Sequence, residues 1–465
     1  MPNLKRRLLK TTSGALLTAL LLASCAPTPT PEVIRETSVP VEVTKLVPGD
    51  TVIVTATPAP AEPISLVVWT DAVSIQSNAD DDQGNPKMLA MAKELFEQEH
   101  PGVTVVYEDH GWDEQLRQNL TNALLAGTAP DVIVGELFFR NYAALDALLP
   151  LDDVLDDVKD DLIPGTYSAA FFDGKIYGLS NSTGVYGFQR NCDVVKAAGL
   201  DCDAPPETWD ELLEQAQQIA AAGNGDYFGF TMLGTPSYFL AAPFYLSPLY
   251  AQAGASMCKN DCTEPWFNDP KAVPVLEFAR AMNATTPPGL TFEPDQGKLF
   301  DQLNKGVTAY QIAGSWFVPW SPAQGCADCR YSQIPIPEGG QPASTLVANV
   351  MYAPLKASKH PELAKEFVKL IGSRMEVQSL AFSSIGRLPA TRSALAALQP
   401  TVDKDTQQFI DVLLNSDNLV TPPQFAKDPQ KIWAIYSELI DKLYTTDTPV
   451  QQLMDEAQAK VDELK

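Results

Sequence analysis

Hydrophobic residues near the start of the folded part of the chain follow two different spacings. Residues 64–69, Ile-Ser-Leu-Val-Val-Trp, form a nearly continuous apolar run, which is typical of a strand buried in a parallel sheet. Within 86–99, Met88, Met91 and Leu95 recur every three or four residues with charged residues between them. This second spacing predicts an amphipathic helix.

The same alternation continues downstream. Residues 103–107 predict a second strand, 113–126 predict a helix that stops at Gly127, and 131–134 predict a third strand. Strands that alternate with helices of this length indicate βαβ units. The sequence therefore predicts an α/β fold with a parallel sheet.

A second α/β series starts after residues 175–179. Thr208 and Glu211 have the spacing of a capping box, in which each side chain bonds the backbone N–H of the other residue, and a helix is expected over 209–222. Two further helices are expected near the end of the chain, over 429–443 and 449–464. The residues expected to cap them are Asp428 and Thr448.

Acidic residues are dense in two segments. Between 151 and 162, acid pairs recur every four residues among apolar ones, which fits either a cation site or the solvated face of a helix; the solvated face is favoured. Residues 80–82 are three aspartates, but the twelfth position of a calcium loop counted from Asp80 is Met91 rather than glutamate. We expect no metal site.

The first 24 residues have the pattern of a signal peptide. They contain four cations and no acid, followed by the apolar run 14–23. That run is shorter than the roughly 18 residues that span a bilayer, and no other stretch approaches this length. Arg6 and Arg7 fit a twin-arginine signal as well as an ordinary basic segment, so the export route stays open.

Cys25 follows Leu22-Ala23-Ser24, a sequence that resembles the lipobox of bacterial lipoproteins, in which the cysteine becomes the lipid-bearing N-terminus. Residues 26–63 contain eight prolines and seven threonines, which predicts an extended tether over 25–63. The alternative is a small hairpin, because residues 41–47 and 51–55 alternate around a Pro-Gly-Asp turn.

The remaining 64–465 are more than one core usually organises, which favours two lobes. The formal charge is −25, and without the signal peptide 29 basic residues stand against 58 acidic ones. Such a surface repels nucleic acid and anionic lipid.

Six cysteines remain once Cys25 is assigned to lipid. They lie in three close pairs, and in an oxidising compartment we favour local disulfides, although sequence alone permits 15 connectivities. The Cys-x-x-Cys pair could also be a redox or zinc motif, but it lacks a second pair or nearby histidines. The expected pairs are Cys192 with Cys202, Cys258 with Cys262, and Cys326 with Cys329.

Nine short segments, in this order, are similar to the maltose-type family of extracellular solute-binding proteins of ABC transporters. The resemblance covers essentially the whole of 64–465. The segments are 64–70, Gly127-Thr-Ala-Pro-Asp131, Tyr177-Gly-Leu179, Lys196-Ala-Ala-Gly-Leu200, 206–212, Phe267-Asn-Asp-Pro-Lys-Ala272, Gly314-Ser-Trp316, Leu363-Ala-Lys-Glu-Phe367 and Gly386-Arg-Leu-Pro-Ala390.

The resemblance implies a two-lobed periplasmic-binding-protein-like fold with a hinge and a ligand cleft between the lobes. One lobe is expected to comprise about 64–178 and 345–388, the other about 184–338 and 392–465. It further implies a monomer that captures a sugar and passes it to ABC permease subunits, held at the outer side of the membrane only by its N-terminal lipid. Polyamine, iron and phosphonate binders have related folds and are the alternative.

Candidate ligand residues come from two arguments. Cleft residues of open α/β sheets follow the carboxyl ends of strands, which selects Trp69, Asp71, Trp112 and Glu136. Aromatic rings stack on sugar faces, and carboxylates bond sugar hydroxyls. The family resemblance adds Tyr186, Trp316, Trp320 and Arg387. Each has a bland alternative as a core, hinge or surface residue, and Trp209 and Trp433 are expected in the core.

Enzyme and adhesin readings are less favoured. A glycosidase needs only two suitably spaced carboxylates, which sequence cannot exclude, but the chain has only three histidines and no Gly-x-Ser-x-Gly or His-Glu-x-x-His motif. It also lacks the repeats common in adhesins. The sequence therefore predicts a carbohydrate-binding protein without catalytic residues or cofactor.

Overall fold

The chain divides into two units, Met1–Ala59 and Pro60–Lys465. The computed structural model describes residues 63–70, 85–111, 113–136, 138–234, 241–260, 262–293, 295–341, 345–415 and 419–464. The expected signal peptide, the lipidation site Cys25, the tether with its alternative hairpin, and Asp80–Asp82 lie outside the described residues.

Nine strands form one sheet with the order β2-β1-β3-β12-β6-β10-β7, while β11 pairs with β6 and β13 pairs with β12. Two small hairpins, β4-β5 and β8-β9, lie apart from it. The strands are β1 (Ile64–Thr70), β2 (Val103–Asp109), β3 (Val132–Gly135), β4 (Phe171–Phe172), β5 (Lys175–Ile176), β6 (Leu179–Asn191), β7 (Phe228–Phe230), β8 (Cys258–Lys259), β9 (Glu264–Pro265), β10 (Thr308–Gly314), β11 (Cys329–Ser332), β12 (Thr345–Pro354) and β13 (Leu419–Val420).

Helices cover this sheet and connect its strands. The α-helices are α2 (Asn85–Glu99), α3 (Asp113–Ala126), α4 (Phe139–Ala144), α5 (Pro164–Tyr167), α6 (Cys192–Ala197), α7 (Trp209–Gly223), α8 (Ala241–Gln252), α9 (Val273–Asn283), α10 (Gln296–Asn304), α11 (Phe317–Trp320), α12 (Pro361–Ser373), α13 (Met375–Gln378), α14 (Leu380–Ile385), α15 (Arg392–Leu398), α16 (Lys404–Asn415), α17 (Pro429–Thr445) and α18 (Val450–Asp462). Short 3₁₀ turns are η1 (Asp152–Val154), η2 (Ser168–Ala170), η3 (Pro270–Ala272), η4 (Leu290–Phe292) and η5 (Gln399–Thr401).

The first βαβ series is confirmed. β1 pairs in parallel with β2 from Ile64 opposite Val103 to Thr70 opposite Asp109, and also in parallel with β3. The expected helices over 86–99 and 113–126 are α2 and α3. Of the apolar positions that predicted α2, Met88 is fully buried, and Met91 and Leu95 are partly buried against the same core, so the helical period correctly selected the inner face.

Two hydrophobic cores organise the unit Pro60–Lys465. The first lobe is built around a core that includes Leu66, Val132 and Met351, and the second lobe around one that includes Phe188 and Trp433. Each core draws on distant parts of the sequence, because the chain crosses between the lobes more than once. The residue boundaries expected for the lobes stay a prediction.

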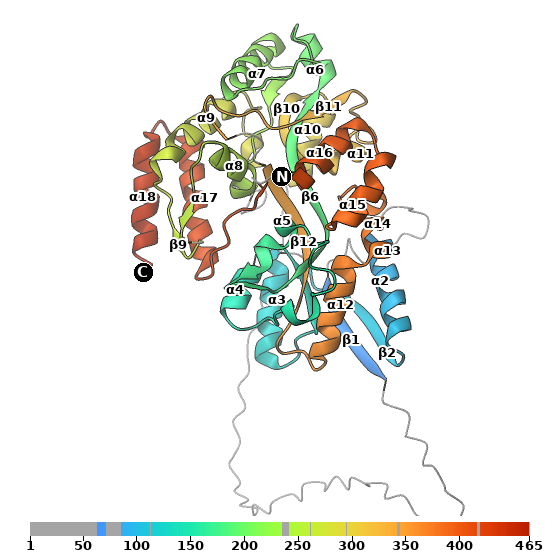
Figure 1. Cartoon of the computed structure of the whole chain (residues 1–465). Helices are drawn as coiled ribbons and strands as arrows, with labels where there is room; N and C mark the ends of the chain where they lie inside the picture. Colours follow the sequence, from blue (N-terminus) through green and yellow to red (C-terminus); the bar gives the residue numbers. More distant parts are fainter. Residues whose placement is uncertain are drawn as a thin grey trace, which may run out of the picture. The chain divides into compact units, whose positions relative to one another are not determined.

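Long strands connect the lobes. The first part of β6 pairs antiparallel with β12, up to Val185 opposite Val347, and its last part pairs with β10 and β11. Thr183 forms an isolated bridge with Leu388, which brings a third segment to the same place. In Figure 1, β6 and β12 lie between the half with β1 and α12 and the half with α7 and α9.

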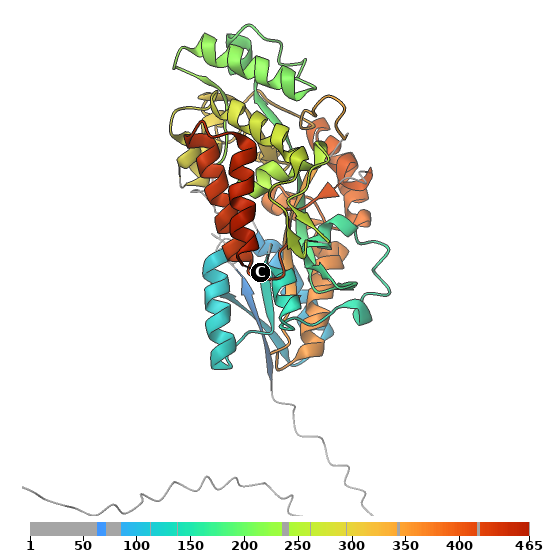
Figure 2. The same cartoon turned by 90° about the vertical axis from the view of Figure 1, so that its left-hand side faces the viewer.

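The C-terminal helices are close to their expected ranges; Asp428 is the N-cap residue of α17 as expected, although its side chain makes no cap, whereas the expected cap Thr448 is wrong. Asp428 precedes α17 with φ of 47° and makes no capping bond, and its carboxylate instead lies 3.2 Å from Lys431 Nζ. Pro449, not Thr448, is the N-cap residue of α18. The packing of α17 and α18 side by side, visible in Figure 2, stabilises both helices without side-chain caps.

The acidic segment at 151–162 is not a regular helix, which corrects the favoured expectation. It contains η1 followed by turns. Its acids bond other elements: Asp153 lies 2.7 Å from Lys365 Nζ, and Asp157 lies 2.5 Å from Lys369 Nζ. These ion pairs hold the segment against α12, so tertiary contacts decided its conformation.

Other local predictions are confirmed. The capping box at the start of α7 is present, with Thr208 accepting from the Glu211 N–H and Glu211 accepting from the Thr208 N–H. Trp209 and Trp433 are buried. The six cysteines form the three expected local disulfides. In the described ranges, no helix has the length and apolar character needed to cross a membrane.

Candidate functional site

The carboxyl ends of β1, β2 and β3 meet at one edge of the sheet, since the three strands run parallel. Trp69, the sixth residue of β1, is only 5% exposed. Its ring stacks on His110 at 3.6 Å, and its Nε1 donates to Glu108 Oε2 at 2.9 Å. Trp69 is therefore packed in the first lobe, with one face covered by His110, and its binding role stays a prediction.

Three other residues were predicted at this edge from the sequence. Glu136 directly follows β3 and is half-buried. Asp71 and Trp112, predicted from the same strand-end rule, lie outside the described residues. Glu136 is thus the carboxylate that the structure shows at the end of the third strand.

On the second lobe, the structure brings three predicted residues into one aromatic cluster, which consists of Tyr186, Tyr245, Trp316 and Arg387. The Tyr186 ring meets Trp316 edge to face at 5.4 Å and Tyr245 at 5.0 Å. The Tyr186 hydroxyl donates to the Tyr245 hydroxyl at 3.4 Å. The Arg387 guanidinium lies 4.5 Å from the centre of the Trp316 ring. These residues are far apart in sequence, and Tyr245 on α8 was not predicted.

Two glycines make room for the indole. A Cβ at Gly314 would lie 2.1 Å from Trp316 Cη2, and one at Gly184 would lie 2.7 Å from Trp316 Cζ3. Both contacts are shorter than atoms allow, so any larger residue would displace the ring. Gly314 on β10 and Gly184 on β6 therefore fix where Trp316 lies.

Charges from both lobes act on the two phenols. Burial is the main cause that raises the pKa of Tyr186 above its ordinary value, and the charge of Glu136 raises it further while Arg387 opposes the shift. Tyr245 also has a raised pKa, first from burial, then from Tyr186, with the same contributions from Glu136 and Arg387. Both phenols stay protonated near neutral pH and can donate hydrogen bonds.

Trp320 ends the short helix α11 that follows Trp316. It is 41% exposed, and its ring meets Phe317 edge to face at 6.2 Å. An exposed indole beside the aromatic cluster offers a free apolar face.

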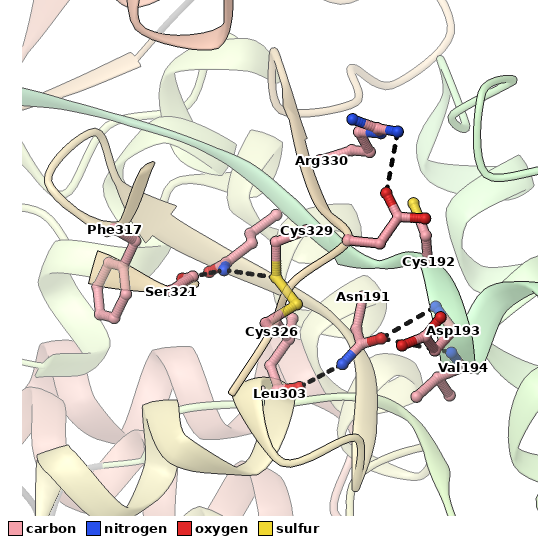
Figure 3. The surroundings of a disulfide bond; sticks show 12 residues. Asn191, Cys192, Asp193, Val194, Leu303, Phe317, Ser321, Cys326, Cys329 and Arg330 are labelled. Atoms are coloured by element: carbon pink, nitrogen blue, oxygen red, sulfur yellow. Dashed lines mark hydrogen bonds and ion pairs between the residues drawn. A yellow bond between two sulfur atoms is a disulfide. The ribbon is translucent and has the colours of Figure 1, made fainter. Parts of the chain in front are cut away.

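A hydrogen-bonded anchor holds α11 on the sheet. Gln189 Nε2 on β6 donates to Ser321 Oγ at 2.7 Å and to Tyr331 Oη at 3.0 Å. Tyr331 Oη in turn donates to the Phe317 carbonyl. The Cys326–Cys329 disulfide, which Figure 3 shows, closes the loop that follows. Cys329 Sγ lies 3.3 Å from Gln189 Nε2. This anchor positions both Trp316 and Trp320.

A pocket of about 720 Å³ lies between the lobes. The first lobe contributes polar residues of α3 and α4, and the second lobe contributes the segment that leads into α17. Asn141 Nδ2 donates to the Ala426 carbonyl across it. None of the predicted site residues lines it. The helical spacing of Gln118, Thr121 and Asn122 could have indicated a polar face of α3. The sequence alone could not show that the segment before α17 lies opposite that face.

The described residues also limit the chemistry of the site. In the ranges that the structure describes, no three His, Cys, Asp or Glu side chains are arranged to hold a metal ion. The cluster combines aromatic faces, phenol donors and one guanidinium, and the charge of Glu136 acts on its two phenols. Such a set recognises hydroxyls and apolar ring faces.

Comparisons with known proteins agree with this geometry. Residues 79–377 match the family described as bacterial extracellular solute-binding protein. A putative binding protein of Brucella abortus is 31% identical over 221 residues, which cover 46% of this chain and 52% of that protein. This chain thus aligns with about half the length of the first curated relatives that it matches.

Two longer alignments extend the comparison. The arabinooligosaccharide-binding protein of Bacillus subtilis is 25% identical over 76% of this chain and 83% of its own length. The crystal structure of a cyclic alpha-maltosyl-1,6-maltose binding protein from Arthrobacter globiformis superposes with a TM-score of 0.70 at 18% identity. It covers 86% of this chain and 99% of that one, which shows a shared two-lobed fold.

Proposed function

This chain belongs to the bacterial extracellular solute-binding protein family, and we propose that it captures a carbohydrate between its lobes for an ABC importer. The observation that carries this proposal is the cluster of Trp316, Tyr186 and Arg387, on whose phenols the charge of Glu136 in the first lobe also acts. The relatives named above are binding proteins, which supports a role in capture rather than catalysis.

The proposed contacts follow from sugar chemistry. A sugar ring has an apolar C–H face that packs on an indole and hydroxyls that pair with planar polar groups. Trp316 and Trp320 offer indoles, while Glu136 accepts and Arg387 donates. We propose that Asp71, Trp69 and Trp112 complete the first-lobe side. An oligosaccharide that outgrows the cluster would continue into the pocket between α3, α4 and the segment before α17.

Closure of the lobes provides the mechanism of capture. A ligand shifts a conformational equilibrium only by its different affinity for the two states. A sugar held on Trp316 in the second lobe and on Glu136 in the first makes both sets of contacts only when the lobes are together. In our proposal this movement occurs about the connections between the lobes, which are β6, β12 and the segment that the bridge between Thr183 and Leu388 holds beside them.

A thermal-shift screen of the purified protein tests the proposal. The panel contains arabino-, malto-, manno- and chito-oligosaccharides, with spermidine, ferric citrate and a phosphonate as non-sugar solutes. A ligand at about 100 times its dissociation constant stabilises the folded state by about 2.7 kcal/mol. We expect at least one oligosaccharide to raise the melting temperature. A shift with a non-sugar solute alone would contradict carbohydrate capture.

We propose in addition that the chain acts outside the cytoplasm as a monomer anchored by lipid on Cys25. Three sequence features support the anchor: the lipobox, the signal pattern of 1–24 and the Pro-rich segment 25–63. Membership of an extracellular solute-binding family supports a location outside the cytoplasm. Labelled palmitate should enter the wild type expressed in a bacterial host but not Cys25→Ala. Equal labelling of both, or labelling of neither, would rule the anchor out.

A further inference from the structure

A second pocket, of about 740 Å³, lies on the second lobe, and no predicted sugar-site residue lines it. We call it the charged pocket: β6 and β11 form its floor, and the first turns of α16 form its wall. Its charged residues are Arg190, Arg330, Lys404, Asp203, Asp403, Asp405 and Asp411. Its volume lies within the range of small-molecule sites, about 300–1,000 Å³.

Arg190 is the most unusual residue of the charged pocket. Its side chain is buried, with 5% exposure. One guanidinium nitrogen donates to Ser332 Oγ at 2.7 Å, while Nε is buried and has no hydrogen-bond partner. Among the described residues, no carboxylate lies within 4.0 Å of this guanidinium. A buried cation whose donors are not all satisfied is costly, so Arg190 can take a further acceptor besides Ser332.

A second arginine lies directly beside it. β11 pairs antiparallel with β6, and the register places Arg330 opposite Arg190. Residues directly opposite share a face of the sheet, and like charges there are destabilising. Arg330 is paired on one side with Asp328 at 2.9 Å. An anion between the two guanidinium groups would relieve their repulsion.

The wall of α16 supplies the opposite charge. Asp403 accepts from the Thr406 N–H at 2.7 Å, which caps the helix, and Asp405 accepts only from Gln408 Nε2 at 3.3 Å. Burial raises the pKa of Asp405, and the neighbouring Asp403 raises it further, whereas Arg190, Arg330 and Lys404 lower it. Among the described residues, no cationic side chain lies within 4.0 Å of the Asp405 carboxylate.

Charged groups of both signs thus face one pocket, and the Arg190 guanidinium has an unsatisfied donor there. A simple anion would meet the carboxylates of α16, and a simple cation would meet the two arginines. A metal ion is not supported, since no suitable group of ligands occurs in the part of the chain that is described. A ligand with a carboxylate and an ammonium group satisfies both walls at once.

We propose that the charged pocket is a second binding site for a free amino acid, with its carboxylate on Arg190 and Arg330 and its ammonium on Asp405 and Asp403. The site lies on the second lobe alone and does not depend on the proposed sugar site. It gives the protein a second small-molecule ligand class.

The test is calorimetric titration of the purified protein with each of the protein amino acids. For the tightest of them, the matched controls are its deaminated and its decarboxylated analogue, each of which removes one charge. We expect saturable one-to-one binding of the amino acid and at least about tenfold weaker binding of either analogue, because charge-assisted hydrogen bonds are lost.

Variants locate the site. Asp405→Asn and Arg330→Gln change side chains at the rim of the pocket, so they should fold and should each weaken binding about tenfold or more. Arg190→Lys should do the same, with circular dichroism as a check of folding. Trp316→Ala should leave amino-acid binding unchanged.

Three results would overturn the second site. They are the absence of binding by any amino acid, equal binding of the singly charged analogues, and binding that survives both Asp405→Asn and Arg330→Gln. Loss of amino-acid binding in Trp316→Ala would also reject it, because the ligand would then lie in the interlobe site. The first three results do not bear on carbohydrate capture, whereas the last would place a non-sugar ligand in the proposed sugar site.

Discussion

The position of the Trp316 ring depends on two glycines that lie beside it. The indole fills the space left by Gly184 and Gly314 and supports Arg387 on its face. A ring wedged in this way keeps its orientation before any ligand arrives, which reduces the entropy lost on binding. The glycines are therefore part of the proposed binding surface, although they contact no ligand.

Gly314→Ala tests this dependence. The added methyl would lie 2.1 Å from Trp316 Cη2, so the ring must move. Overpacking of this kind costs about 1–3 kcal/mol of folding stability, and we expect weaker oligosaccharide binding as well. Urea unfolding and titration measure the two effects.

Gly297→Ala is the control for that substitution. Gly297 lies in the first turn of α10, where a Cβ would approach only Asp295 Oδ1, the oxygen that caps the helix, at 3.2 Å. Its replacement should change stability by no more than about 0.5 kcal/mol and leave binding intact. If Gly314→Ala behaves like Gly297→Ala, the wedged position of Trp316 is wrong.

The roles of single residues could be predicted from the sequence to different degrees. Trp209 and Trp433 were predictable as core because each lies on the apolar face of an amphipathic helix. Asp428 was a sound N-cap candidate by residue type, but its positive φ turned the carboxylate to Lys431. Tyr245 could not be foreseen, since its neighbours Tyr186 and Glu136 reach it only through the fold.

At the scale of elements, ion pairs join the last two helices. Glu438 on α17 bonds Lys460 on α18, and Lys442 on α17 lies 3.2 Å from both Glu438 and Glu456. The hydrogen bonds from Lys460 and then Lys442 are the main causes that lower the pKa of Glu438 below its ordinary value of 4.5. The charged form of Glu438 is therefore favoured by folding.

The pH dependence follows from that direction. A carboxyl with a lowered pKa in the folded state adds stability that is complete above 4.5 and is lost as pH falls through the lower folded value. Glu438→Gln should cost between about 0.2 and 1 kcal/mol at neutral pH, the range for exposed pairs. The difference from wild type should vanish in acid and shrink in high salt.

Glu463→Gln provides the comparison. Glu463 follows α18, and among the described residues it forms no ion pair within 4.0 Å. Urea unfolding of both variants across pH measures the difference. A Glu438→Gln effect that persists unchanged at low pH would show that the side chain acts by packing rather than by charge.

Elements with regular periodicity were predictable, because their apolar spacing alone selects helix or strand. This holds for β1, α2, β2 and α3, whose bounds differ by at most two residues from those expected. The segment 151–162 was not, since its acids had partners on α12 that no local pattern shows. An acidic segment with helical apolar spacing does not by itself predict a helix, because its carboxylates can instead pair with lysines of another element.

At the scale of the molecule, the two-lobed arrangement followed from the resemblance rather than from periodicity. Local patterns indicated α/β units but not that β6 and β12 pass between two cores. The interlobe pocket joins α3 to residues before α17, about 300 positions later in the chain. Contacts of such separation have no signal in a single sequence.

The central claim is that the lobes close on a sugar that stacks on Trp316. The decisive measurement is calorimetric titration of the best oligosaccharide from the screen into wild type, Trp316→Ala and Phe171→Ala. Phe171 is an exposed aromatic of the first lobe, 37% exposed, and serves as the matched control. Urea unfolding of each unliganded variant accompanies the titration.

We predict one-to-one binding by wild type and Phe171→Ala, and a loss of about 2 kcal/mol, about 30-fold in affinity, for Trp316→Ala. Because Trp316 is only partly buried, its removal should cost less than the roughly 3–5 kcal/mol of stability typical of a core tryptophan. Unchanged affinity of Trp316→Ala, or an unliganded variant destabilised by that full amount, would contradict the account.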